Sequence, residues 1–175
     1  RVVTTATNNT LVGPYAGYDL TTGAYNTIIG SEADGNNETG GYNVVIGYQA
    51  AAGAHGSSHS SNVIAGYRSG FTITTGGSNV LLGQSAMQTI TTGTRNVAVG
   101  VEAGFRNSTT SYNVYMGYGA GREHIGNNAV HIGGEAGYYA TGSSNTFMGY
   151  QAGKGGTTSA PYSSGEKNVA IGHDA

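Results

Sequence analysis

A five-residue phrase that begins with Asn and ends with Gly recurs along the whole chain at a nearly fixed step. Typical copies are Asn26-Thr-Ile-Ile-Gly30, Asn43-Val-Val-Ile-Gly47 and Asn96-Val-Ala-Val-Gly100. The closing glycines lie 17, 17, 19, 17, 17, 17, 16, 16 and 23 residues apart. They are Gly13, Gly30, Gly47, Gly66, Gly83, Gly100, Gly117, Gly133, Gly149 and Gly172. Such a period is the signature of a solenoid, in which each repeat forms one coil stacked on the last. The sequence therefore predicts one repeat domain over residues 1–175, with about ten coils.

Residue types within one repeat indicate an all-β fold. The residues between Asn and Gly are β-branched or aliphatic, which favours a strand. Glycines and Thr/Ser/Asn clusters follow them, and these are typical of corners. No segment has apolar residues at helical spacing over a helical length. We therefore expect a parallel β-solenoid, or β-roll, with a repeat of about 17 residues.

Composition excludes several classes of partner and chemistry. The net charge is −2, and the seven basic residues are scattered singly, so the clustered basic face that nucleic acids require is not present. The chain has no cysteine, which excludes disulfides and thiolate metal sites. No apolar run is long enough for a membrane helix, so no membrane insertion is expected. Because the chain starts at Arg1 and stops at Ala175 in mid-repeat, we expect a segment of a longer protein.

The alternation of side chains along a strand predicts which residues face the coil interior. We assign to the interior the residues one and three places after Asn, such as Val44 and Ile46. Continuing this parity through the corner adds the small residue three places after Gly. This small-residue set is Ala16, Ala33, Ala50, Ser69, Ala86, Ala103, Ala120, Ala136, Ala152 and Ala175.

The opposite face of the same strands is then also apolar. A strand exposed on one side should alternate apolar and polar residues, and a continuous apolar stripe is rare on a soluble monomer. We therefore predict that this second face is covered by sister chains in a homotrimer around a shared axis. The predicted trimer interface consists of Leu11, Ile28, Val45, Ile64, Leu81, Tyr115, His131 and Phe147.

The two residues that frame the phrase have predicted structural roles. Stacked copies of Asn place one side-chain amide above the next, so we expect a hydrogen-bonded Asn ladder. The closing Gly is expected at a corner with positive φ or with close backbone approach.

Two stretches resemble a known family. Asn43-Val-Val-Ile-Gly-Tyr-Gln-Ala50 and Thr141-Gly-Ser-Ser-Asn-Thr-Phe-Met-Gly-Tyr-Gln-Ala-Gly153 are similar to repeats of phage tail-fibre and tail-spike proteins, which often precede an endosialidase-type chaperone domain. They also resemble the head repeats of trimeric autotransporter adhesins. The resemblance implies a left-handed parallel β-roll, a homotrimer and a location on a virion tail or a cell surface. The repeat of about 17 residues is longer than the adhesin step, and nothing matches the chaperone domain.

The sequence gives little indication of catalytic groups. Glu32, Glu102, Glu135 and Asp174 share one position two residues after Gly, but the other coils carry unrelated residues there, as expected for a solvated face. The sequence contains no Ser-His-Asp arrangement, phosphate loop or calcium loop. We expect no enzyme activity and no cofactor.

Candidate binding residues are histidines and tyrosines. His55 and His59 lie in the coil with two extra residues, where a loop or an incomplete metal site are the two interpretations. His131 could meet its symmetry mates on a three-fold axis and hold a metal or an anion. Exposed tyrosines can stack on sugar rings, although stacked tyrosines also simply stabilise solenoids. The predicted binding set is Tyr48, Tyr67, Tyr118, Tyr150, His55, His59 and Tyr162.

We interpret the chain as a structural and adhesive segment of a trimeric tail fibre or surface adhesin, a rigid rod that presents binding surfaces to a host glycan or receptor. Two alternatives stay open. Paired threonines such as Thr21-Thr22 and Thr91-Thr92 suggest a monomeric ice-binding solenoid. Tail spikes can also build polysaccharide-degrading sites between chains.

Overall fold

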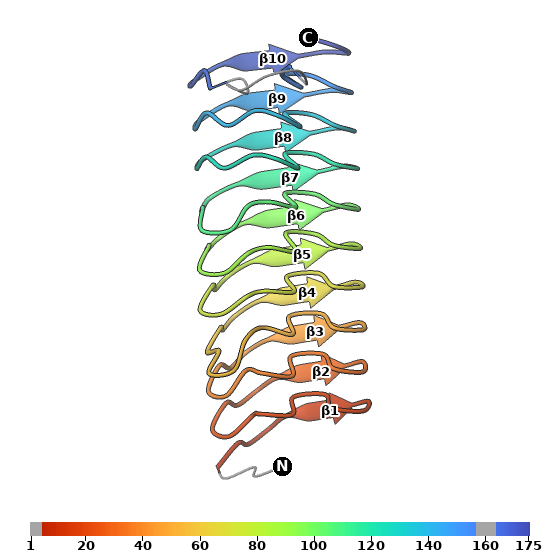
Figure 1. Ribbon diagram of the computed structural model, residues 1–175, viewed down its shortest axis with the longest axis vertical. Coiled ribbons are helices and arrows are strands. Elements are labelled where there is room, and N and C mark those ends of the chain that lie inside the picture. The colour runs from red at the N-terminus through yellow and green to blue at the C-terminus, as the bar shows by residue number, and fades with distance from the viewer. Residues whose placement is uncertain (1–4, 157–163) are drawn as a thin grey trace.

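The computed structural model describes residues 5–156 and 164–175, and it contains ten short parallel strands in a single sheet. The strands follow one another in chain order, so each coil pairs only with the coils before and after it (Figure 1). Their bounds are β1 Thr10–Val12, β2 Thr27–Ile29, β3 Val44–Ile46, β4 Val63–Ala65, β5 Val80–Leu82, β6 Val97–Val99, β7 Val114–Met116, β8 Val130–Ile132, β9 Thr146–Met148 and β10 Val169–Ile171. The predicted parallel β-solenoid is confirmed.

Register follows the repeated phrase without a slip. Val45 pairs with Ile28 on one side and with Ile64 on the other, and each of the three lies two residues after its Asn. Equivalent positions therefore stack into columns, one residue per coil. The 19-residue step of the third coil leaves this register intact, so its two extra residues are accommodated outside the strand.

The corner after each strand depends on glycine. Gly47 has a φ of 129°, and a Cβ built there would lie 2.7 Å from the carbonyl oxygen of Gly66 in the next coil. Both the positive φ and the close backbone approach were predicted. Two residues later, Gln49 also has a positive φ of 53°, and the residues at this position in the other coils share it.

The structure inverts the predicted interior face of the strands. Val45 is fully buried within its own chain, whereas Val44 and Ile46 on either side are 37% and 41% exposed. The predicted interface residues Ile28, Ile64, Leu81, Tyr115, His131 and Phe147 are likewise buried inside the coil, and Leu11 packs against the same core. The predicted trimer interface through this column is therefore wrong. We call these residues, together with Ala98 and Ala170, the interior column.

Two features of the backbone explain the inversion. Each Asn lies two residues before the interior column, so the two share a face, and the Asn side chains between the two terminal coils are buried as a ladder. The small residues after the corner are buried as predicted, except Ala175, which is exposed. The alternation of inward and outward side chains cannot be extended from these small residues back into the strand, however. Two residues with positive φ lie at each corner and interrupt it.

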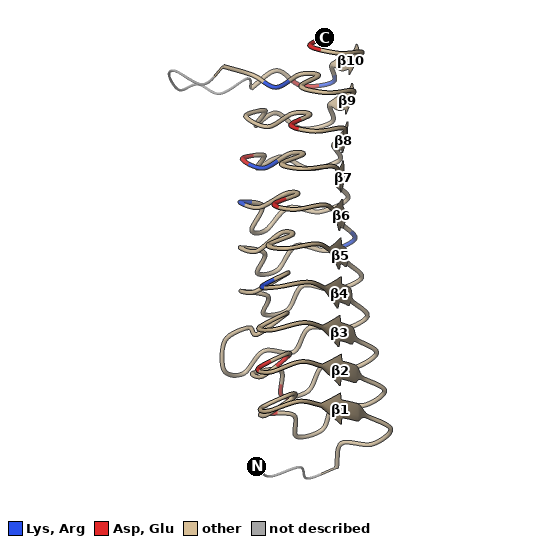
Figure 2. Cartoon of the chain, turned by 90° about the vertical axis from the view of Figure 1, so that its right-hand side faces the viewer, with Lys and Arg blue, Asp and Glu red and all other residues tan. Residues whose placement is uncertain are grey.

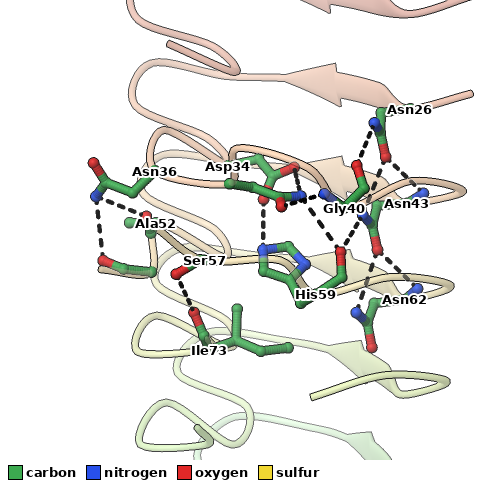
Figure 3. Close-up of polar contacts among 12 residues, drawn as sticks. Asn26, Asp34, Asn36, Gly40, Asn43, Ala52, Ser57, His59, Asn62 and Ile73 are labelled. Carbon is green, nitrogen blue, oxygen red and sulfur yellow. Dashed lines mark hydrogen bonds and ion pairs between the residues drawn. The ribbon is translucent and has the colours of Figure 1, made fainter. Parts of the chain in front are cut away.

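The Asn ladder is confirmed. Asn43 Nδ2 donates to Asn26 Oδ1 over 3.1 Å, and Asn62 Nδ2 donates to Asn43 Oδ1 over 3.2 Å (Figure 3). Each amide also reaches a carbonyl farther along the chain, as Asn43 does with His59 O at 2.9 Å. The ladder continues through Asn113, and Ala129 then occupies the Asn position of β8. The amides thus satisfy backbone groups inside the coil while tying consecutive coils together.

A second buried column lies eleven residues after Asn in most coils, and it was not predicted from the sequence. Leu20, Ile73 and Ile90 are fully buried there. The polar residues Asn37, Asn107 and His124 occupy the same position in other coils and are also buried. The signal was available, because three aliphatic residues recur at one offset of the repeat.

Candidate functional surfaces

The outward face of the sheet is an apolar strip. It is built from the residues one and three places after Asn, which we call the outer columns. Exposed members are Val12, Ile29, Val44, Ile46, Val63, Met116, Met148, Val169 and Ile171, and half-buried ones include Val80, Leu82, Val97, Val99, Val114, Val130 and Ile132. Figure 2 shows the strands stacked along one side of the rod, whereas most charged residues lie on the opposite side. The strip therefore runs the length of the sheet with little charge beside it.

Exposed tyrosines accompany the strands at both ends. Tyr48, Tyr67, Tyr118 and Tyr150, which directly follow the corner glycines, are 46%, 47%, 59% and 49% exposed. Of these, Tyr48 and Tyr67 stack with ring centroids 5.9 Å apart. Before the strands, Tyr25 and Tyr42 stack at 5.1 Å. Tyr48, Tyr67, Tyr118 and Tyr150 are thus on the surface, as predicted. Stacked pairs of tyrosines occur along the rod, but they do not form one continuous row.

His59 is not a surface ligand, contrary to the prediction. It is fully buried, and its Nε2 lies 2.7 Å from Asp34 Oδ1 in a contact that is closed to solvent (Figure 3). Asn37 Nδ2 donates to the other carboxylate oxygen of Asp34 over 3.1 Å. A buried pair of this kind depends on both partners being present, so His59 and Asp34 are structural.

His55, by contrast, is exposed and joins two distant coils. Its Nδ1 lies 2.6 Å from Asp19 Oδ2, although Asp19 belongs to the first coil and His55 to the third. The longer third coil therefore folds back across the second coil, as the extended loop of Figure 2 shows. Tyr162 lies outside the described residues. Within residues 5–156 and 164–175, no group of three or more His, Cys, Asp or Glu side chains is arranged to hold a metal ion.

His131 is enclosed by aromatic rings of its own chain, so the predicted three-fold cluster of this residue is also wrong. Its ring stacks on Phe147 at 5.0 Å and meets His124 edge-on at 4.8 Å. Burial, with a smaller contribution from His124, lowers the pKa of His131 to about 3. Burial also lowers the pKa of His124, whose Nδ1 lies 2.6 Å from the hydroxyl of Tyr115. Both imidazoles are thus held neutral inside the solenoid.

Three of the four carboxylates that share a position after the corner, those of Glu32, Glu102 and Glu135, form hydrogen bonds between neighbouring coils. Gln49 Nε2 donates to Glu32 over 2.7 Å, and Arg122 Nε donates to Glu102 over 2.7 Å. Glu135 accepts from Gln151 at 2.7 Å and from Lys154 at 2.6 Å. Lys154 and Gln151 lower the pKa of Glu135. These contacts indicate surface cross-links between coils rather than a paired acid and base.

In the described part of the chain, no helix has the length and apolarity to cross a membrane. Comparison with protein-family models, with curated proteins and with solved structures returns no match.

Proposed function

We propose that this chain is a structural and adhesive segment, a left-handed β-roll that associates into a trimeric fibre through the outer columns of its sheet. The observation that carries the proposal is the largely apolar outer face of the sheet, which is exposed or half-buried along the strands, with Val12 53% and Ile46 41% exposed. Apolar surface left in water forgoes about 25 cal/mol per Å² of burial. A strip this continuous is typical of a protein interface.

The dimensions of the strip suit association between copies. A strand of three residues spans about 10 Å, and ten strands at about 4.8 Å spacing extend over about 45 Å, which gives roughly 450 Å² per chain. Stable interfaces bury roughly 800 Å² per partner. The strip supplies about half of this area, and the exposed tyrosines at the strand ends can supply the rest. If the rods of the copies lie parallel, each coil of one chain can contact the equivalent coil of its neighbour along the whole strip.

The number of copies and the biological setting come from the resemblance to phage tail-fibre and trimeric adhesin repeats. That resemblance favours three chains around one axis, on a virion tail or a cell surface, with a host glycan or receptor as the target. Stacked coils held by backbone hydrogen bonds and Asn amides form a stiff spacer. In this role the segment needs neither catalysis nor a cofactor.

The test measures molar mass in solution by light scattering. The wild-type segment is expected at three times the 17.7 kDa of one chain. Ile46→Glu and Met116→Glu place charges in the outer columns and should give folded monomers. Ile125→Glu is the matched control, because Ile125 is an exposed apolar residue outside the strands. A wild-type monomer, or a trimer that both strand variants leave intact, would refute the proposal.

The alternative of ice binding has a specific observation in its favour. Thr22, Thr39, Thr75, Thr92 and Thr109 are exposed in one column along the rod. The adjacent threonine hydroxyls are engaged with the backbone, however, as Thr74 Oγ1 is with Thr91 O at 3.1 Å. Thermal hysteresis from a stable monomer would favour ice binding, and degradation of a host polysaccharide by the segment would favour an enzyme.

A further inference from the structure

A hollow opens on the charged side of the rod where the first three coils meet. It has a volume of about 200 Å³ and is lined by Tyr15, Tyr18, Glu32, Gly35, Asn36 and Ala52. The first two residues come from the first coil, the next three from the second and the last from the third. The loop that carries His55 crosses the same region through its contact with Asp19. The hollow is therefore built by three coils and not by a flexible terminus.

Its origin is visible in one column of the repeat, nine residues after each Asn. Gly35 and Ala52 occupy this column in the second and third coils. Other coils carry larger side chains there: Tyr18, Phe71, Gln88, Phe105, Arg122, Tyr138 and Lys154. Two small residues in succession remove the side chains that cover this side of the rod elsewhere. The hollow is thus a local departure from the repeat. A segment that served only as a uniform shaft would have no use for it.

The groups around the hollow offer both apolar rings and hydrogen-bond acceptors. Tyr15 and Tyr18 are 64% and 45% exposed, and their rings meet edge-on at 5.5 Å. Glu32 is held by Gln49 through one carboxylate oxygen, Oε2, at 2.7 Å. Asn36 Nδ2 donates to Ala52 O at 3.0 Å and to Gly53 O at 3.2 Å, which fixes the amide. Figure 3 shows the oxygen of Asn36 turned away from these carbonyls.

We propose that this hollow binds one pyranose ring of a neutral glycan. A sugar ring has an apolar face of C–H groups, which suits a tyrosine ring, and hydroxyls that donate to a carboxylate and an amide oxygen. Glu32 disfavours an anionic sugar, and the volume holds a single ring rather than a long chain. The inference deepens the adhesive role proposed above by naming a ligand class. It can fail separately, because all six lining residues lie in one chain and outside the outer columns.

The test uses saturation-transfer NMR with the methyl glycosides of glucose, galactose, mannose and N-acetylglucosamine. A ligand of this size is expected to bind in the millimolar range. Gly35→Phe should weaken binding by about tenfold or more, since Phe71 and Phe105 fill the same column in other coils. A Cβ at Gly35 meets nothing closer than 3.5 Å, so the variant should fold. Gln88→Phe, in the same column away from the hollow, is the matched control and should bind like the wild type.

A second variant, Tyr18→Ser, removes one ring without filling the space and should also weaken binding. Saturation transfer to none of the four sugars at about 10 mM would overturn the inference, as would binding that survives both Gly35→Phe and Tyr18→Ser. The molar mass of each variant is measured in parallel. A trimer that binds no sugar would support the fibre proposal and overturn the sugar site. A monomer that binds sugar would support the sugar site and refute the fibre proposal.

Discussion

The interior column changes its chemistry along the rod. From β1 to β6 it is aliphatic, with Leu11, Ile28, Val45, Ile64, Leu81 and Ala98. From β7 to β9 it is aromatic or imidazole, with Tyr115, His131 and Phe147. The backbone register is the same in both regions. The comparison shows how one coil geometry accommodates side chains of very different size.

Room for the large rings is made at a second position, eight residues after each Asn. Opposite the three rings this position is always glycine: Gly121, Gly137 and Gly153. A Cβ there would lie 2.4 Å from Tyr115, His131 or Phe147, respectively. In the aliphatic region the same position also carries Asp34, Ala51 and Met87. Each ring thus occupies the space that a side chain fills in some other coils, so a ring in the interior column requires glycine at this second position.

The largest effect is expected from breaking this pairing. Gly137→Ala places a methyl group against the His131 ring at a φ of 59°, so we expect a loss of about 3–5 kcal/mol from the clash and the left-handed conformation together. The matched change Gly70→Ala, where the nearest contact is 3.0 Å from a flexible Leu81 carbon, should cost less, about 1–2 kcal/mol. Urea unfolding measures both.

A double variant tests whether the ring itself is what requires glycine. His131→Val with Gly137→Ala recreates the pair formed by Val45 and Ala51 in the third coil. It should be more stable than Gly137→Ala alone, because the methyl group no longer meets a ring. Equal stabilities would show that the positive φ, and not the ring, requires glycine.

Acid should weaken the aromatic region selectively. Burial holds the pKa of His131 at about 3, well below the ordinary value of 6.5. The unfolded chain therefore takes up a proton as the pH falls below about 6.5, while the folded chain resists protonation down to about 3, and stability falls across this window. The slope approaches about 1.4 kcal/mol per pH unit below pH 6.5, so roughly 2 kcal/mol is lost between pH 6.5 and 4.5.

The measurement is a series of urea unfolding curves at several pH values. His131→Phe keeps an aromatic ring and removes the titrating group, so its stability should depend less on pH. His124, which His131 meets edge-on, leaves a residual dependence because burial lowers its pKa as well. An unchanged slope in His131→Phe would show that His131 is not the group responsible.

Sequence reasoning predicted several features that repeat and failed where a feature occurs once, although it also overlooked the repeated column eleven residues after Asn. The strands, the glycine corners and the Asn ladder recur in most coils, so the period predicted them. The pairing of Asp34 with His59 joins different positions of two coils, the second of which contains the two-residue insertion, so no period marks it. The hollow beside Gly35 is also a single event. The inverted interior face had another cause, because alternation was carried through corners that contain two positive-φ residues.

The smallest effect concerns the Asn ladder, which also differs between the two regions. In the aliphatic region Asn79 Nδ2 donates to Asn62 Oδ1 at 3.1 Å and to Gly93 O at 3.0 Å, and its own Oδ1 accepts from Asn96 N at 3.0 Å. Asn79→Ala should therefore cost about 2 kcal/mol, mostly from buried groups left unpaired.

A comparison with the aromatic region shows why the loss of stability in Asn79→Ala should stay moderate. Ala129 already occupies the Asn position of β8, and Asn145 in the next coil donates its amide to Gly142 O at 2.9 Å and to Gly165 O at 2.7 Å. In Asn79→Ala, Asn96 can turn to backbone carbonyls in the same way. Urea unfolding with Thr92→Ala, an exposed change, as the control measures the cost. A loss above about 4 kcal/mol would mean that the aliphatic region cannot rearrange as the coil of Ala129 has done.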